Sequence, residues 1–389
     1  MLPLALSASL VGLAQPLVAA EMPNPLMELA PTAHQLNVIY FVADGVEPVP
    51  GYEQRLNELL IYLQQYYGRE MARNGFGPRS FGLPMTPEGK VEIVLLRGKR
   101  PQKDYAYSGE GAINCLREID AFFEAHPEKK RSEHTFVIMP TFYNEEYNDE
   151  SPGGVPFFGF GKNCFALDYA HFDLRYLGED SLRGRLMTKW FGGFAHELGH
   201  GLNLPHNDGT ASERATLGTP LMESGNYTFG RSATFLTPAS ARILDRNQVF
   251  APVGSGIDYY QTQERPELRD LTVRYTGASL DVSLQIPAGY RANAYIQDPP
   301  FVVNQDYDNV AFPMQEVGGP EQGMQRVAVQ MPLAELTRLK NVGKGEQCIS
   351  LLLIAPDGSR FRRELPFAWE GLQPGDALPI APGEMSSGY

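Results

Sequence analysis

The stretch His196-Glu197-Leu198-Gly199-His200-Gly201-Leu202-Asn203-Leu204-Pro205-His206 carries the strongest signal in the chain. Two histidines four positions apart lie on one face of an α-helix, so both imidazoles can reach a single metal ion. Glu197 follows the first histidine, where its carboxylate can address a water on the metal instead of the metal. Gly201 is free to take a positive φ, which can end the helix and turn the chain. That turn would bring His206 round as a third ligand.

Three neutral imidazoles with one open water position are typical of a catalytic zinc site, whereas structural zinc sites normally have four protein ligands. The alternative is a helix with two surface histidines and a third nearby by accident. The HExxH pattern alone arises by chance in roughly one such chain in a hundred, and the third histidine makes coincidence far rarer. The pattern therefore predicts a hydrolytic zinc centre held by His196, His200 and His206, with Glu197 as its catalytic base.

The segment resembles the metzincin clan of zinc metallopeptidases, whose extended motif is HExxHxxGxxH. Asn203 stands here in place of the last glycine, and asparagine is the residue that next best tolerates the left-handed conformation of a sharp turn. Metzincins also carry a tight turn with a methionine beneath the zinc. Residues 218–225 (GTPLMESG) resemble that Met-turn, with Met222 as the candidate, although a loop methionine filling a core gap is the alternative.

The resemblance implies a metzincin-like α/β (α+β) catalytic domain with a mixed sheet and an active-site helix, over roughly residues 35–250. It also suggests a further catalytic residue, since in some metzincins a tyrosine just beyond the Met-turn reaches the zinc. There the tyrosine lies two positions after the methionine, where this chain has Ser224. Tyr227, five positions after Met222, is a candidate donor to the developing oxyanion. The alternative is a tyrosine packed under the cleft.

Length and charge restrict the classes of protein to which the chain can belong. Its 389 residues suffice for two domains with separate cores. A net charge of −13 argues against nucleic acid or an anionic membrane surface as the main partner, because both require basic patches. A protein or peptide substrate remains compatible with this charge, and the oligomeric state stays open.

Residues 1–20 have the features of a secretory signal peptide: an uncharged apolar run followed by small residues before Glu21. We therefore expect an exported protein, periplasmic or secreted, although a buried N-terminal helix is the alternative. No apolar stretch is long enough to span a membrane. Of the three cysteines, Cys115 and Cys164 would pair most simply and leave Cys348 free, while three unpaired thiols are the other possibility.

The first part of the chain alternates between strand-like and helix-like patterns, which predicts an α/β layer with parallel strands. The glycine- and phenylalanine-rich residues 153–168 are interpreted as an edge strand and its approach, with an aromatic cover over the sheet as the alternative. A helix from Leu182, with apolar residues at four-residue spacing, runs into His196 and His200, and Thr237-Pro238 begins another helix. The predicted strands are 37–42, 91–96 and 135–139. Of the predicted helices between them, one begins at Tyr52 and ends near Gly75, and the other spans 113–123.

Short β-rich runs follow residue 262 and predict an all-β, sandwich-like domain. Asp357-Gly358 is interpreted as a hairpin turn between two of its strands. The predicted organisation is a signal peptide at 1–20, a zinc metallopeptidase catalytic domain at 21–262, a β-sandwich-like domain at 263–370 and an extended tail at 371–389.

Together these features predict an exported zinc-dependent endopeptidase in which Glu197 assists the attack of zinc-bound water on a peptide bond. One alternative is a zinc hydrolase of another amide, such as a cell-wall peptide; another is a secreted binding protein with a structural metal. The expected cofactor is one Zn²⁺ per chain. The acidic residues 144–150 (NEEYNDE) could bind Ca²⁺ but lack the EF-hand spacing, so a solvated charge run is favoured. The other histidines (His34, His126, His134 and His171) are expected at the surface or with satisfied ring nitrogens.

Overall fold

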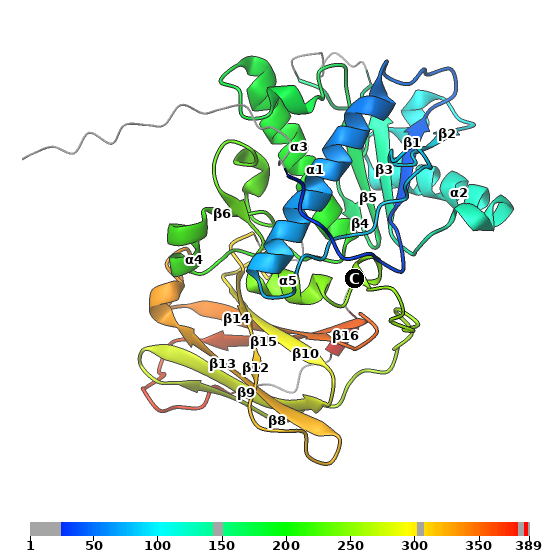
Figure 1. Ribbon diagram of the computed structural model, residues 1–389. Coiled ribbons are helices and arrows are strands. Elements are labelled where there is room, and N and C mark those ends of the chain that lie inside the picture. Colours follow the sequence, from blue (N-terminus) through cyan, green and yellow to red (C-terminus); the bar gives the residue numbers. More distant parts are fainter. Residues whose placement is uncertain (1–24, 143–150, 302–306, 380–384, 388–389) are drawn as a thin grey trace, which may run out of the picture.

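The computed structural model describes residues 25–142, 151–301, 307–379 and 385–387. The predicted signal peptide and the acidic residues 144–150 lie outside these ranges. Figure 1 shows an α/β unit stacked on a β-sandwich, with α4 and α5 close to the junction. The prediction of an α/β domain followed by a β-rich domain is thus confirmed. Within the described residues, no helix combines the length and apolar character needed to cross a bilayer.

The sheet of the α/β unit has the strand order β2-β1-β3-β5-β4. Its first four strands are parallel, and only β4 runs antiparallel to its neighbour β5. Residues 153–168 were predicted to form an edge strand. Only β4 lies at the edge of the sheet, because β5 lies between β3 and β4. The strands are β1 (Asn37–Val42), β2 (Val94–Arg97), β3 (Thr135–Pro140), β4 (Gly159–Phe160) and β5 (Asn163–Asp168).

Helices cover both faces of this sheet, as the alternation along β3 shows. Phe136 contacts Phe194 of α3 (Leu182–Gly201), with ring centroids 4.4 Å apart. Met139 points the other way and contacts Cys115 of α2 (Gly109–Ala125). On the α3 face, the Tyr67 hydroxyl of α1 (Tyr52–Arg73) donates to the carbonyl of Ala195. The helix that carries the histidine pair is thus packed against both α1 and the sheet.

The sequence pattern predicted the buried face of α1 correctly and that of α3 only in part. In α1 the predicted apolar stripe is buried, from Tyr52 to Tyr67. In α3 the buried positions include Met187 and Phe191, whereas Leu182 of the predicted stripe is 44% exposed. The four-residue spacing therefore predicted the helix correctly and part of its buried face wrongly. Each of α2 and α3 begins at a serine N-cap whose hydroxyl accepts a backbone N–H, which satisfies one of the free donors of the first turn.

Four short elements follow α3 before the chain enters the sandwich, besides two 3-10 turns. Thr237 caps α5 as predicted, by accepting from the backbone N–H of Ser240, and Pro238 occupies the first turn. The elements are α4 (Ala211–Leu217), the two-stranded parallel pair β6 (Thr219–Pro220) and β7 (Thr234–Phe235), and α5 (Pro238–Leu244).

The sandwich consists of two antiparallel sheets around a core of its own. One sheet has the order β11-β10-β14-β15-β16 and the other β12-β13-β9-β8. The predicted hairpin turn at Asp357-Gly358 joins β14 to β15, with Gly358 at φ +80°. The strands are β8 (Arg269–Tyr275), β9 (Ser279–Pro287), β10 (Arg291–Gln297), β11 (Val310–Pro313), β12 (Gln315–Glu316), β13 (Met324–Pro332), β14 (Glu346–Ile354), β15 (Arg360–Ala368) and β16 (Met385–Ser387).

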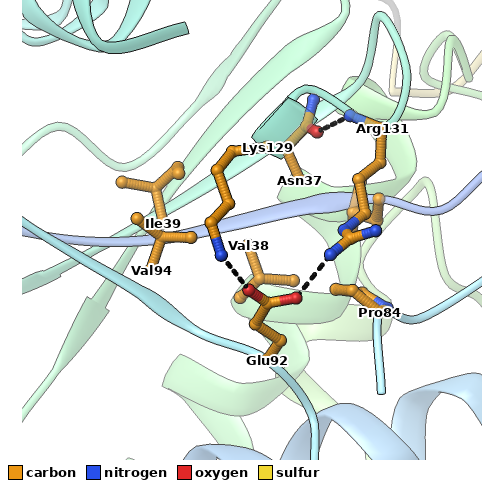
Figure 2. Close-up of a pocket in the computed structure, with 9 residues that line it drawn as sticks. Asn37, Val38, Ile39, Pro84, Glu92, Val94, Lys129 and Arg131 are labelled. Carbon is orange, nitrogen blue, oxygen red and sulfur yellow. Dashed lines mark hydrogen bonds and ion pairs between the residues drawn. The ribbon is translucent and has the colours of Figure 1, made fainter. Parts of the chain in front are cut away.

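A cluster of charged side chains lies at the N-terminal ends of the strands of the α/β sheet (Figure 2). Glu92 accepts from the Lys129 ammonium at 2.7 Å and from the Arg131 guanidinium at 2.5 Å, which holds the pKa of Glu92 below its ordinary value. The Arg131 backbone N–H also donates to the Asn37 side chain. The adjoining cavity has a volume of about 10 Å³, too small for more than about one water molecule. This cluster therefore fixes the segment before β2 and offers no room for a ligand.

The prediction that Cys115 pairs with Cys164 is wrong. Both thiols are buried and free, as is that of Cys348. The sheet separates the first two: Cys115 lies on α2 beside Met139, whereas Cys164 lies on β5 with its thiol 2.7 Å from the position that a Cβ at Gly201 would occupy. Residues in one domain need not be within disulfide reach, since a bridge requires Cα atoms within about 7 Å.

Candidate active site

The end of α3 and the turn after it bring the three predicted ligands together. Asn203 lies in the left-handed region at φ +73°, as its substitution for glycine predicted, and reverses the chain. Ligand atoms of His196, His200 and His206 all lie within 4.8 Å of one another. The Nε2 atoms of His200 and His206 are 3.0 Å apart. Two nitrogens of a tetrahedral zinc site lie about 3.3 Å apart, so this spacing suits zinc.

Hydrogen bonds to carbonyls set the orientation of two of the rings. His196 donates from Nδ1 to the carbonyl of Leu221 at 2.8 Å, and His200 donates from Nδ1 to that of Leu204 at 2.8 Å. In a neutral imidazole this leaves Nε2 as the lone-pair donor, which is the usual arrangement of a histidine metal ligand. Burial lowers the pKa of His196 to about 4 and that of His200 well below its ordinary value. Both rings are therefore neutral and ready to bind a cation.

Glu197 lines the cleft beside His200 and His206. Burial raises the pKa of Glu197 to about 8, while a hydrogen bond from the Gly159 backbone N–H acts in the opposite direction. A cation at the histidine cluster would also favour the carboxylate form. A carboxylate tuned in this way can accept a proton near neutral pH.

Met222 packs against α3 at Gly199, one residue before His200. It is 1% exposed, and its sulfur lies 2.4 Å from the position that a Cβ at Gly199 would occupy. The next residue along, His200, is one of the clustered histidines, and the carbonyl of Leu221, which precedes Met222, accepts from His196. The loop around Met222 therefore supports α3 from below and orients one ring of the cluster.

Two positions near the cluster require glycine, because neighbouring atoms leave no room for a Cβ. Gly201 is the last residue of α3, but its φ is not positive, so the expected role in a left-handed turn is wrong and Asn203 has that role. A Cβ at Gly201 would meet Cys164 at 2.7 Å, and one at Gly159 would meet the His200 Cβ at 2.2 Å. The approach of β4 and β5 to α3 thus requires both glycines, and only the tertiary contact reveals it.

Asparagine at position 203 does more than tolerate the turn. Its side-chain amide donates to the Tyr260 hydroxyl at 3.3 Å, and its backbone carbonyl accepts from Arg360 of β15. The same Tyr260 hydroxyl lies 2.6 Å from Nε2 of His134, whose Nδ1 donates to the carbonyl of Gly201 at 2.7 Å. His134 is therefore a buried, satisfied histidine, as expected, and the turn after α3 is held from both domains.

Asn207 fixes the loop just after His206. Its side chain is fully buried, accepts from the Thr237 hydroxyl at 2.7 Å and donates to the Pro205 carbonyl and to Ser240 at 3.0 Å. These contacts attach the loop to the beginning of α5. Sequence reasoning assigned Asn207 no role; its one signal was its place beside the third histidine.

The histidine cluster opens into a cleft of about 350 Å³, a volume typical of sites that bind small ligands. One wall is aromatic, and the sandwich supplies the other. Tyr307 stacks on the ring of His206, with centroids 3.8 Å apart. The residues that line the cleft are Tyr107, Phe157, Phe158, Gly159, Gly161, Glu197, His200, Asn203, Leu204, Pro205, His206, Tyr307, Arg360 and Arg362.

Tyr227 is placed differently from the other predicted site residues. It ends the short 3-10 helix Gly225–Tyr227, is 64% exposed and is not among the residues that line the cleft. The aromatic side chain that the structure brings against the cluster is instead Tyr307, which sequence reasoning missed because it lies in the other domain.

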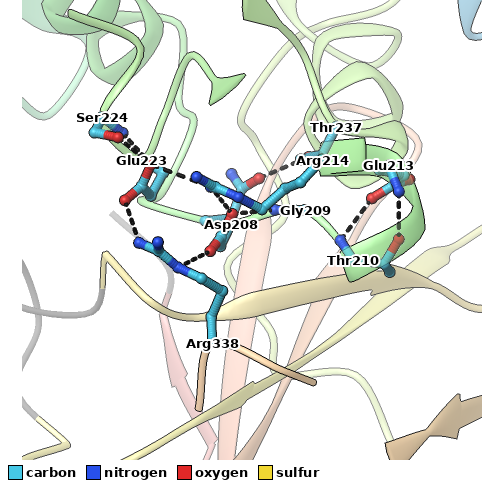
Figure 3. A network of polar contacts seen from close by, with 10 residues as sticks. Asp208, Gly209, Thr210, Glu213, Arg214, Glu223, Ser224, Thr237 and Arg338 are labelled. Carbon is cyan, nitrogen blue, oxygen red and sulfur yellow. Dashed lines mark hydrogen bonds and ion pairs between the residues drawn. The ribbon is translucent and has the colours of Figure 1, made fainter. Parts of the chain in front are cut away.

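An ion network ties the loops on both sides of the cluster to the sandwich (Figure 3). Asp208, whose side chain is fully buried, and Glu223 both accept from Arg214 of α4, at 2.5 and 3.2 Å. Burial raises the pKa of Asp208, and the Arg214 guanidinium opposes that shift. Arg338 of the sandwich reaches the same two carboxylates, at 3.4 and 3.1 Å. The loops after His206 and Met222 are therefore held by one set of charges.

Replacing Arg214 by alanine is expected to lower the free energy of unfolding by about 3 kcal/mol, because two buried carboxylates lose the less exposed of the two cations that they share. Arg338→Ala is the matched control: its side chain is 48% exposed, so about 1 kcal/mol or less is expected. Urea denaturation of the metal-loaded proteins measures both. Equal losses in the two variants would show that burial of the carboxylates does not control the network's stability.

No family model matches the chain, and no curated protein does. Solved structures do match. Wild-type OgpA from Akkermansia muciniphila is 45% identical with a TM-score of 0.86, and the match covers 92% of this chain and 99% of that one. A second crystal form of wild-type OgpA is 44% identical, with a TM-score of 0.84 and coverage of 92% and 98%. Catalytically inactive OgpA in complex with an O-glycopeptide substrate, glycodrosocin, is 44% identical, with a TM-score of 0.86 and coverage of 92% and 99%.

Proposed function

Because the chain belongs to the same family as OgpA from Akkermansia muciniphila, we propose that it is a zinc-dependent endopeptidase that cleaves the peptide chain of O-glycosylated substrates. The observation that carries this proposal is the match to catalytically inactive OgpA bound to an O-glycopeptide, which spans 99% of that protein. A match of that extent includes both domains and therefore both walls of the cleft.

The chemistry of the cleft supports a peptidase. His196, His200 and His206 would hold the ion through Nε2 atoms, two of which are oriented by carbonyls. A bound zinc ion would polarise the scissile carbonyl and lower the pKa of the attacking water. Glu197 takes the proton from that water and passes it to the leaving amine. The Gly159 backbone N–H holds the Glu197 carboxylate in place for both transfers.

The aromatic wall of the cleft suits the glycosylated part of the substrate. Phe158 packs edge-on against Tyr107, with centroids 5.8 Å apart, and Phe157 packs edge-on against Trp190 at 5.1 Å. Faces of such rings are apolar surfaces against which the C–H face of a sugar can lie. The volume of the cleft, about 350 Å³, lies within the range of small-ligand sites.

Two other functions fit the structure less well. A zinc hydrolase acting on a cell-wall amide would use the same residues, but the relative with the O-glycopeptide favours a glycosylated peptide. A binding protein with a structural metal has no use for Glu197 beside an open cleft. We further propose that the protein is exported, because residues 1–20 have the apolar run and the small residues of a secretory signal peptide.

Mass spectrometry of reaction products tests the proposed function. The zinc-loaded protein is incubated with an O-glycopeptide and with the same peptide lacking its glycan. Cleavage of the peptide backbone is expected for the glycosylated form, at least tenfold faster than for the bare peptide. Intact glycopeptide after long incubation would contradict the proposal, and equal cleavage of both would leave a peptidase without the proposed preference for glycans.

A further inference from the structure

The C-terminal end of α3 is held by side chains from distant parts of the chain. Three successive backbone carbonyls at this end accept hydrogen bonds from side chains at least 45 residues away in sequence. The last carbonyls of a helix have no partner within it, so these donors satisfy groups that would otherwise be buried and unpaired. The pairs are His134 Nδ1 with Gly201 at 2.7 Å, Asn247 Nδ2 with Leu202 at 2.9 Å, and the Arg360 guanidinium with Asn203.

The turn 203–206 controls two of the three clustered histidines. His206 is its last residue. The carbonyl of Leu204 lies within the turn and accepts from Nδ1 of His200 at 2.8 Å, which orients the His200 ring. The ring of His196 is oriented instead by a carbonyl of another loop. A shift of the turn would therefore move His206 and rotate His200 at the same time, and the three ligand atoms would no longer lie together.

One hydroxyl joins the groups that hold this turn. The Tyr260 hydroxyl accepts from the side-chain amide of Asn203 at 3.3 Å and from the backbone N–H of Gln248 at 3.1 Å. Burial lowers the pKa of His134 to about 4, so its ring is neutral; Nδ1 donates to Gly201 and Nε2 can accept. The Tyr260 hydroxyl donates to that Nε2 at 2.6 Å. Its single proton and both of its lone pairs are thus in use.

The backbone at Tyr260 has a conformation that tyrosine rarely adopts, with φ +61°. For a bulky residue such a conformation costs free energy and persists only where surrounding contacts hold it. The β14–β15 hairpin supplies these contacts. The Asp357 carbonyl accepts from the Tyr260 N–H at 2.9 Å, and the Asp357 carboxylate accepts from the next two backbone N–H groups at 2.8 and 2.7 Å. The hairpin of the sandwich thus directs the Tyr260 side chain toward the end of α3.

We propose that Tyr260 is a positioning residue of the metal site, whose hydroxyl holds the turn 203–206 where His200 and His206 can bind one zinc ion together. The proposal rests on the zinc site of the proposed function and adds a residue that does not line the cleft. Removal of groups that support metal ligands typically lowers metal affinity or activity by about 10- to 100-fold. Tyr260→Phe takes the hydroxyl from three polar partners and keeps the ring, so the turn loses its restraint while the packing volume stays.

Zinc affinity measured without substrate tests this role. Wild-type protein, Tyr260→Phe and Tyr259→Phe are stripped of metal and titrated with zinc in competition with a chromophoric chelator. Tyr260→Phe is expected to raise the Kd for zinc at least tenfold. Tyr259→Phe is the matched control, because it makes the same change at the adjacent residue, which is buried and packs its ring edge-on against His34 with centroids 5.8 Å apart. Its Kd should equal that of the wild type.

Two further measurements separate positioning from general stability. Unfolding midpoints of the metal-free proteins show how much stability each variant loses before any metal binds. The visible absorption of the cobalt-substituted proteins reports the geometry of the ligands, and it should change in Tyr260→Phe and stay the same in Tyr259→Phe.

Asn203→Gly tests the same role from the other side of the contact. Glycine keeps the positive φ of the turn and removes the amide that donates to Tyr260. The Kd for zinc should rise about threefold, as for the loss of one neutral hydrogen bond. If Tyr260→Phe does not fold, this variant decides alone, and an unchanged Kd would overturn the positioning role.

The outcomes distinguish this proposal from the proposed function. A rise of Kd in Tyr260→Phe and Asn203→Gly, absent from Tyr259→Phe, supports the positioning role even if no glycopeptide is cleaved. A wild-type Kd and an unchanged cobalt spectrum in Tyr260→Phe reject it and leave the peptidase intact. An equal rise of Kd in Tyr259→Phe also rejects it, because the effect would then follow from lost stability. Wild-type protein that binds no zinc would overturn both proposals.

Discussion

Replacement of Glu197 by glutamine is expected to lower kcat about a thousandfold while zinc stays bound. Glutamine keeps the shape of the side chain and can still accept from the Gly159 backbone N–H, but it cannot take a proton from the attacking water. Glu197 does not belong to the histidine cluster, so the metal site should keep its affinity. General acid–base catalysis contributes about 10²–10⁴ to such reactions, which sets the size of the loss.

Steady-state kinetics on an O-glycopeptide, together with elemental analysis for zinc, measures this effect. The thermal unfolding midpoint is recorded with both, so that a loss of fold is not taken for a loss of the base. A variant that contains about one zinc per chain and retains more than a tenth of the wild-type kcat would exclude Glu197 as the proton acceptor.

His200→Ala is expected to abolish both zinc binding and activity. Two imidazoles that remain cannot match the affinity of three, and the lost ring also contacts His206 at 3.0 Å. The purified wild-type protein should contain about one zinc per chain and lose activity on treatment with a chelator. Added zinc should restore the wild type and leave the variant inactive.

His126→Ala serves as the matched control for this experiment. His126 lies at the end of α2 with its side chain 53% exposed and is not part of the cluster, so its loss should change neither zinc content nor turnover. Zinc in His200→Ala at the wild-type level, measured by elemental analysis after dialysis, would contradict the assignment of the ligands.

The helical period explains why the core of the candidate site was predictable. Residues four apart share a helix face whatever the helix packs against, so His196 and His200 could be paired from sequence alone. The left-handed turn was predictable for a similarly local reason, because Asn203 is one of few residues that tolerate positive φ, and it has a φ of +73°. The N-cap at Thr237 and the hairpin at Asp357-Gly358 also depend on neighbouring residues only.

The predictions that failed all depended on contacts between distant segments. Cys115 and Cys164 share a domain, but the sheet lies between them. Gly201 was assigned a conformational role, whereas its requirement is the close approach of Cys164. Leu182 was predicted to lie on the buried face of α3 but is exposed, because the apolar spacing does not say which neighbours cover the first turn of a helix.

Local sequence by itself determined the histidine cluster, the place of Glu197 beside it and the turn that unites the three rings, because each depends on spacings of a few residues along one helix and its end. Only the tertiary structure decided what surrounds them. Arg360 reaches the Asn203 carbonyl from 157 residues away, and Tyr307 stacks on His206 from the other domain. Such contacts depend on how the two domains pack against each other, and no periodicity along the chain records that packing. The sandwich thereby supplies one wall of the cleft.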